Sequence, residues 1–105
     1  MTIFGTYLNS IRVNSTLSIA EVSRSTGIHS TLYSRYESGK RTPSKKHLEL
    51  ITAKFSKESK QLEALWLSDK IVELSKGYSS ANEALALAEE RIKYLRNTKN
   101  SWRNH

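Results

Sequence analysis

Short polar side chains crowd one stretch of the sequence, residues 25–40, which reads STGIHSTLYSRYESGK. Ser30, Thr31 and Ser34 supply hydroxyl groups, and Arg35 supplies a guanidinium group among them. A hydroxyl can donate or accept a hydrogen bond and so discriminates weakly between bases, whereas one arginine can span both acceptors of a guanine. These residue types suit contact with the bases of a nucleic acid.

The residues that usually carry catalysis do not gather in this sequence. His29, His47 and His105 lie far apart, with no metal-ligand spacing and no nucleophile beside them. There is no cysteine, which excludes disulfides, thiolate zinc sites and cysteine nucleophiles together. We therefore expect no enzymatic activity, no catalytic residue, no metal and no cofactor. His29 is interpreted as a helix cap or a DNA-facing residue, and His47 as a surface residue.

The charge points to a polyanionic partner. The formal net charge is +7, and residues 1–55 hold 8 Lys/Arg against 3 Asp/Glu, which leaves +5 in the N-terminal half. Nucleic acid is the first candidate partner and an anionic membrane surface the second. The basic residues do not line one face of an amphipathic helix, which argues against the membrane. The alternative of a merely soluble basic protein stays open on charge alone.

The N-terminal residues lack a basic leader and an apolar stretch, so we expect no secretion. No apolar run approaches the roughly 20 residues needed to cross a bilayer. We expect a cytoplasmic protein, associated with the nucleoid when bound to DNA.

Apolar residues recur at helical spacing almost throughout, and nothing indicates a strand pair. Ser18 and Glu21 form a capping box that opens the second helix, which ends near Gly27. Thr42 is expected to cap the fourth helix, with Pro43 as its first residue. The expected helices cover residues 4–11, 18–26, 29–38, 43–55, 56–76 and a last stretch from about residue 80.

The glycine turn between the second and third helices determines how they pack. The turn is too short for antiparallel packing, so the third helix must cross the second steeply, as in a helix–turn–helix whose second helix enters the major groove. Tyr33 and Tyr36 are expected to face the core. The opposite face then carries the expected base-contacting residues: Ser30, Thr31, Ser34 and Arg35. The alternative is that these four are ordinary solvated positions.

Residues 4–55 resemble the lambda-repressor-like (Xre, Cro/C1-type) helix–turn–helix family. The run YESGKRTPS at residues 36–44 is similar to the family's pattern after its groove helix. The resemblance rests on an ordered set of positions: Arg12, Leu17, Ser18, Glu21, Val22, Gly27, Ile28, Tyr33, Glu37, Gly39, Pro43, Leu48, Ile51 and Phe55.

The resemblance implies an all-α fold, with a five-helix DNA-binding domain that acts as a dimer. It implies that the four hydroxyl and guanidinium residues face bases, that Lys40 and Arg41 lie over phosphates, and that Arg12 pairs with Glu37. We add Ser18, His29 and Lys45 as expected phosphate contacts. Three residues depart from the family's usual types: Tyr33, Ser23 and Ile19. Ile19 replaces a polar residue and puts one phosphate contact in doubt.

A heptad-like stripe follows in the C-terminal segment. Leu85, Ala88, Ile92 and Leu95 recur at steps of three and four, and Trp102 continues the phase. We expect this stripe to form a dimer interface; the alternative is that it folds back on the protein's own fifth helix. We divide the chain into a DNA-binding domain at 1–56, a helical dimerisation extension at 57–98 and a frayed tail at 99–105.

These observations predict a sequence-specific transcription regulator. It would bind an inverted-repeat operator in double-stranded DNA as a homodimer, as a repressor or a restriction–modification controller. The extension resembles the tails of small regulators linked to restriction–modification DNA methyltransferases. The alternative is an antitoxin-type protein that holds a toxin partner through its C-terminal helices and represses through its N-terminal domain.

Overall fold

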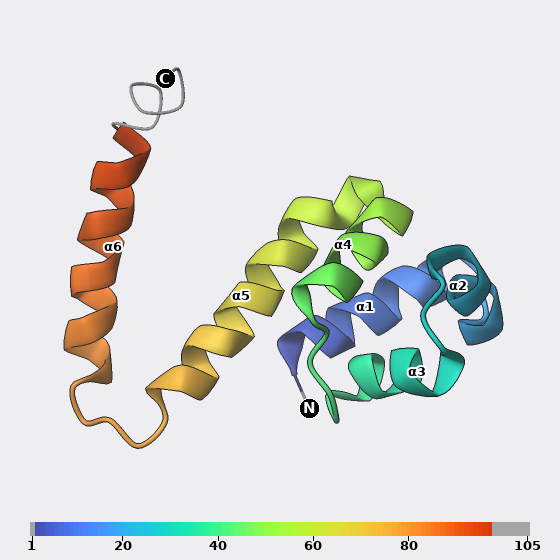
Figure 1. Ribbon diagram of the computed structural model, residues 1–105, viewed down its shortest axis with the longest axis horizontal. Coiled ribbons are helices and arrows are strands. Elements are labelled where there is room, and N and C mark those ends of the chain that lie inside the picture. Colours follow the sequence, from blue (N-terminus) through green and yellow to red (C-terminus); the bar gives the residue numbers. More distant parts are fainter. Residues whose placement is uncertain (1, 98–105) are drawn as a thin grey trace. The chain divides into compact units, whose positions relative to one another are not determined.

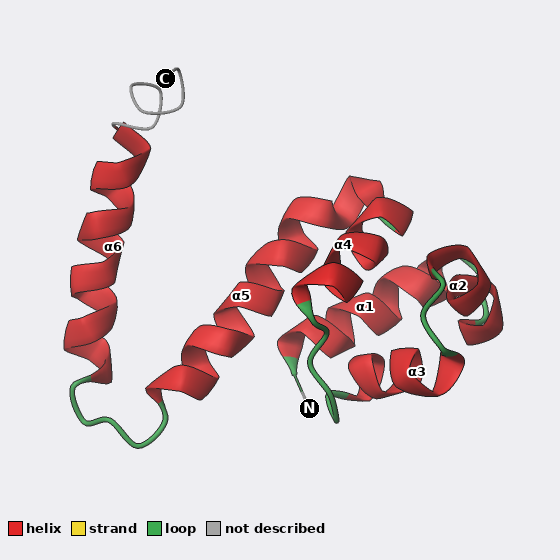
Figure 2. Ribbon diagram, viewed as in Figure 1, coloured by secondary structure: helices red, strands yellow, loops and turns green. Residues whose placement is uncertain are grey.

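The computed structural model describes residues 2–97, and within them it contains helices and no strand (Figures 1 and 2). The predicted all-α class is confirmed. The predicted tail at 99–105, Trp102 and His105 lie outside the described residues. The elements are α1 (Ile3–Asn14), α2 (Ile19–Thr26), α3 (Ser30–Ser38), α4 (Lys45–Lys54), a short 3-10 helix η1 (Ser56–Glu58), α5 (Ser59–Ser75) and α6 (Ala81–Asn97).

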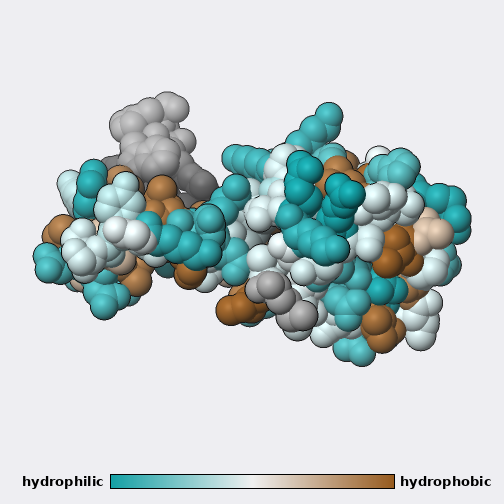
Figure 3. Space-filling view, turned by 90° about the horizontal axis from the view of Figure 1, so that it is seen from below, coloured by the Kyte–Doolittle hydropathy of each residue, from teal (hydrophilic) through white to brown (hydrophobic). Residues whose placement is uncertain are grey.

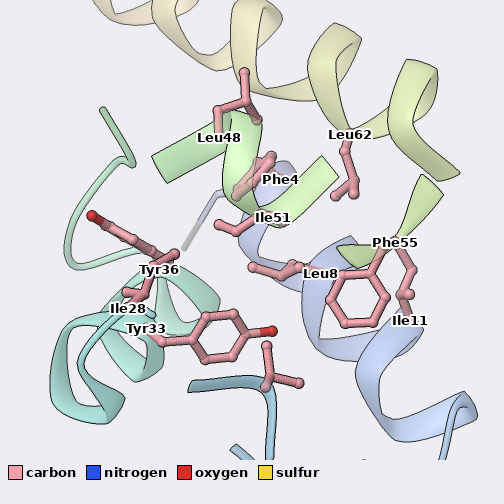
Figure 4. Close-up of a cluster of buried hydrophobic side chains, with 11 residues drawn as sticks. Phe4, Leu8, Ile11, Ile28, Tyr33, Tyr36, Leu48, Ile51, Phe55 and Leu62 are labelled. Carbon is pink, nitrogen blue, oxygen red and sulfur yellow. The ribbon is translucent and has the colours of Figure 1, made fainter. Parts of the chain in front are cut away.

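The described chain forms two compact units, which divide between Val72 and Glu73. The first unit holds one apolar core, built from α1, α2, α3, α4 and the first half of α5 (Figure 4). Tyr33 and Tyr36 both belong to this core, as the sequence predicted. The fully or nearly buried side chains are Phe4, Leu8, Ile11, Val22, Ile28, Tyr33, Tyr36, Leu48, Ile51, Phe55 and Leu62.

Local sequence explains the ends of the two helices that form the turn motif. The Ser18 hydroxyl accepts from Glu21 N at 3.1 Å and the Glu21 carboxylate accepts from Ser18 N at 2.9 Å, so the predicted capping box is present. Gly27, with φ 79°, ends α2, and Gly39, with φ 80°, ends α3. Both take the left-handed conformation that costs glycine least.

The start of the fourth helix differs from the prediction. α4 begins at Lys45, and its N-cap is Ser44, whose hydroxyl accepts from His47 N at 3.1 Å. Pro43 is not the first helical residue; it lies in the preceding loop with a fully buried side chain. The predicted cap at Thr42 was wrong because Ser44 supplies the same hydroxyl nearer the first unpaired N–H groups.

A close approach of two backbones joins α1 to α3. A Cβ atom added to Gly5 would lie 2.6 Å from the carbonyl oxygens of Tyr36 and Glu37. Backbone atoms cannot turn aside as a flexible side chain can. Gly5 therefore lets the C-terminal end of α3 rest directly on α1.

α5 extends the first unit beyond residue 56, where the sequence placed its boundary, to Val72. Leu62 is completely buried. The indole N–H of Trp66 donates to the carbonyl of Pro43 at 2.8 Å, and a carboxylate oxygen of Asp69 accepts from Phe4 N at 3.1 Å. α5 is thus held to the loop before α4 through Trp66 and to the start of α1 through Asp69.

The second unit, from Glu73 on, contains α6. Its heptad-like side chains are exposed: Leu85 by 53%, Ile92 by 54% and Leu95 by 56%. Apolar side chains are visible among hydrophilic ones on this segment in Figure 3. Lys93 Nζ lies 3.8 Å from Glu89 Oε1, one turn away on the helix. Among the described helices, none is long and apolar enough to cross a membrane.

Candidate nucleic-acid interface

The predicted base-contacting residues lie together. All four line one open depression on the outer face of α3, which α2 and the loop after α3 complete. All four side chains are exposed. The lining residues are Ile19, Ser30, Thr31, Ser34, Arg35, Ser38 and Lys40.

The turn that sets the angle of α3 is held from both sides. Ile28 follows Gly27 directly and is buried, so it anchors in the core the segment that leads into α3. The Ser23 hydroxyl donates to the Ile28 carbonyl, and Thr26 Oγ1 accepts from Ile28 N at 3.2 Å. Ser23, which departs from the family's usual residue type, therefore stabilises the turn through its hydroxyl.

Behind α3, a buried ion pair fastens it to α1. Arg12 Nε lies 2.7 Å from Glu37 Oε2, and Arg12 Nη2 donates to Glu37 Oε1 at 3.0 Å. Asn9 Nδ2 donates to the same Oε1 at 2.8 Å, and Arg12 Nη1 donates to the Leu17 carbonyl at 2.9 Å. The two charged side chains are only 14% and 6% exposed.

Burial opposes ionisation of Glu37 and would raise the pKa of its carboxyl. The hydrogen bonds from Arg12 and Asn9 outweigh burial and hold that pKa below its ordinary value. The same bond to Glu37 is the main cause that raises the pKa of Arg12. Both groups are therefore charged at neutral pH, and each compensates the buried charge of the other.

The hydroxyl of Tyr33 is the exception in this network. It is fully buried close to the Glu37 carboxylate, but it makes no hydrogen bond of good geometry with the described residues. Burial raises the pKa of Tyr33 most, followed by the contact of its hydroxyl with the Glu37 carboxylate and by the negative charge of that carboxylate. A buried tyrosine hydroxyl usually has a hydrogen-bond partner, and here Glu37 lies nearby without forming a well-aligned bond.

The residues predicted to contact phosphate are all exposed. Lys40 lines the depression and Arg41, the next residue, is exposed, with its backbone N–H donating to the Arg35 carbonyl at 3.2 Å. Lys45 is exposed at the first position of α4. His29 is the N-cap of α3 and its Nδ1 accepts from Thr31 N at 3.2 Å.

Comparison with known families agrees with this geometry. Residues 8–59, which include α2, the turn and α3, match the family model described as helix-turn-helix. The chain belongs to the lambda-repressor-like, Xre-type helix-turn-helix family. It therefore carries the DNA-binding domain of a transcription regulator, and this family is not one of enzymes.

Comparison with curated proteins gave no match, and comparison with solved structures gave none. The family match ends at residue 59, so it does not reach α6. The relation to regulators of restriction–modification systems stays a prediction.

The N-terminus of α2 is less open to phosphate than the helix-turn-helix arrangement alone would indicate. The Ser18 hydroxyl already accepts from Glu21 N, and the Glu21 carboxylate lies at the same helix end. The backbone and side-chain hydrogen bonds of Ser18 lower the pKa of Glu21, so this end carries a negative charge at neutral pH. Ser18 can still donate its own O–H, but a phosphate there meets the charge of Glu21.

Sequence reasoning missed several residues that shape the helix-turn-helix face. Ile19 lies in the depression, where an apolar group can contact a thymine methyl. His47 is not a free surface residue: its Nδ1 lies 2.6 Å from the Tyr36 hydroxyl. Asn9 joins the Arg12–Glu37 pair. No spacing rule could have found these contacts, because each joins residues from different elements.

Proposed function

We propose that this protein is a sequence-specific transcription regulator that binds double-stranded DNA with α3 in the major groove. The observation that carries the proposal is the depression on α3, where hydroxyls and one guanidinium group lie exposed together. We assign action in the cytoplasm, at the nucleoid.

Within the groove, Arg35 is the strongest reader of sequence. It is the one long cationic side chain among the four base-facing residues, and a bidentate contact to guanine is worth about 1–3 kcal/mol of discrimination. Ser30, Thr31 and Ser34 bring the helix close to the base edges because they are short. Lys40, which lines the depression, and the exposed Arg41 and Lys45 supply the salt-dependent attraction to phosphates.

The protein acts as a homodimer on an inverted repeat. One small domain buries too little surface for tight, specific binding, whereas two linked domains combine their affinities. The exposed stripe of α6, with Leu85, Ala88, Ile92 and Leu95, supports a two-fold interface. A dimer of this kind reads half-sites separated by about 34 Å, one helical turn.

Selection of bound duplexes from a random DNA pool tests the proposal. We expect enrichment of an inverted repeat with half-sites one helical turn apart, and we expect a guanine within each half-site to lose its enrichment in Arg35→Ala. A pool in which wild-type protein enriches no motif would refute sequence-specific regulation.

The dimer is tested separately by sedimentation of the full chain. Wild-type protein is expected to sediment as a dimer, and Leu85→Asp/Ile92→Asp as a monomer. An exposed Glu90→Asp variant is the matched control, because Glu90 lies off the apolar stripe. A monomeric wild type that co-purifies with a second, small protein from its own host would favour the antitoxin function instead. Repression, rather than activation, is tested by a reporter gene placed behind the selected operator.

A further inference from the structure

The loop between α3 and α4, residues 39–44, carries two of the expected phosphate contacts, Lys40 and Arg41 (Figure 1). A loop can present cations to DNA only if it is held, because ordering a free loop on binding costs conformational entropy. At its α3 side, Arg41 N donates to the Arg35 carbonyl at 3.2 Å. At its α4 side, the Pro43 side chain is buried and the Pro43 carbonyl accepts from Trp66 Nε1 at 2.8 Å.

Trp66 comes from α5 and lies outside residues 8–59, the part that matches the helix-turn-helix family. Its ring packs half-buried against the core, and Lys70 Nζ lies 4.7 Å from the ring centroid. A cation over the face of an indole is attracted by the quadrupole of the ring, and this attraction helps to keep the ring in place.

The helix that carries Trp66 is itself fixed. Leu62, one turn earlier, is completely buried, and Asp69, one turn later, accepts from Phe4 N at the start of α1. The indole N–H is thereby aimed at the loop from a helix that is tied on both sides of it.

We propose that Trp66 is a positioning residue for DNA binding: through its hydrogen bond to Pro43 it holds the loop so that Lys40 and Arg41 meet the phosphate backbone. α5 is then part of the DNA-binding apparatus and does more than extend the core. This inference rests on the proposed function, since it requires that the loop contacts DNA.

The first test is Trp66→Phe in the full-length protein, which keeps an aromatic ring and removes the donor. A phosphate contact carries no sequence information, so binding should weaken on the selected operator and on a random duplex alike. We expect about a five- to tenfold loss on each, the scale of one lost hydrogen bond. The slope of log K against log salt should fall by about one.

A thermodynamic cycle separates positioning from general damage. If Trp66 acts through Lys40 and Arg41, then Trp66→Phe should change affinity by less than about twofold in a Lys40→Ala/Arg41→Ala background. An equal loss in both backgrounds would overturn the proposal, as would a Trp66→Phe protein that binds DNA like wild type. Leu65→Ala is the matched control, because Leu65 packs on the same core from the same helix. It should lower the melting temperature and leave DNA affinity unchanged.

A measurement on the unaltered site covers the case in which Trp66→Phe fails to fold. In a Trp102→Phe background, Trp66 is the one remaining indole, and the hydrogen exchange of its Nε1–H can be followed with and without DNA. We expect slower exchange in the complex, and equal exchange would refute the proposal. If the wild type binds no DNA at all, the proposed function has failed; if the wild type binds and these tests fail, only the role of Trp66 is lost.

Discussion

Replacing Arg12 by Met is expected to destabilise this protein in a pH-dependent way. The change removes the two bonds that Arg12 makes to the Glu37 carboxylate and leaves that carboxylate, 6% exposed, with Asn9 alone. Losing one partner of a buried ion pair costs about 3–5 kcal/mol. The cost has an upper limit, however, because the stranded carboxyl can take up a proton.

The limit can be worked out from the ordinary pKa of Glu37. That value is 4.5, so protonation at pH 7 costs about 3.4 kcal/mol, since each pH unit is worth about 1.36 kcal/mol. We therefore expect Arg12→Met to lose about 3–4 kcal/mol of unfolding free energy at pH 7. The loss should shrink by about 2.7 kcal/mol between pH 7 and pH 5.

In wild type, the unfolding free energy should change with pH in the opposite direction. Its Glu37 has a lowered folded-state pKa, so the stabilisation is complete above the unfolded value of 4.5 and is lost as the pH falls through the lowered folded value. In Arg12→Met the folded-state pKa is raised, so the variant gains stability as the pH falls towards 5.

Urea unfolding of the full-length proteins, followed by far-UV circular dichroism at several pH values, measures how the unfolding free energy of wild type and of Arg12→Met depends on pH. Arg12→Met/Glu37→Gln is the matched control, because it removes both charges and leaves Asn9 a hydrogen-bond acceptor. It should lie within about 1 kcal/mol of wild type at pH 7. An Arg12→Met loss that stays constant from pH 7 to pH 5 would refute the reasoning, and so would a double variant as unstable as the single one.

Four further outcomes are expected. In gel-shift titrations, Arg35→Ala should cost about 1–3 kcal/mol on the operator and relax preference at one base pair, and an equal loss on every duplex would make Arg35 a phosphate contact. Lys40→Ala should weaken all duplexes alike and lower the salt slope by about one; an unchanged slope would contradict the phosphate role. Tyr33→Phe removes a buried hydroxyl that makes no well-formed hydrogen bond, so its melting temperature should equal or exceed that of wild type. Gly5→Ala should lose about 1–3 kcal/mol or more, because its Cβ meets backbone atoms, whereas Gly27→Ala meets no atom within 4 Å and should lose only the cost of its positive φ.

The features of the turn motif that could be predicted from the sequence are those that depend on nearby residues. The capping box of Ser18 and Glu21 and the stop at Gly27 depend on residues within a few positions of one another, and a single sequence displays such relations directly. The division of α3 into a core face and an outer face follows from helical period alone, which is why Tyr33 was placed correctly and Ser34 is exposed.

Contacts between different helices could not be predicted from these local relations. Asn9, Trp66 and Asp69 each bond to a group more than 20 positions away, and nothing in local spacing favours those pairs over others. The misplaced cap at Thr42 has a related cause. Pro43 is suited to the first turn of a helix, but its side chain is buried and its carbonyl accepts from Trp66, and both contacts favour its place in the loop.

The contacts of α5 with the rest of the first unit determine the shortest fragment of this protein that is expected to fold. A recombinant fragment cut at the family match, residues 8–59, would omit Phe4 and Leu62, both of them core side chains. Each such loss from a core costs about 2–5 kcal/mol, and a small domain has only about 5–15 kcal/mol in total. The piece expected to fold by itself is therefore residues 2–72, and that longer piece is the unit to transplant when this DNA-reading surface is joined to another protein.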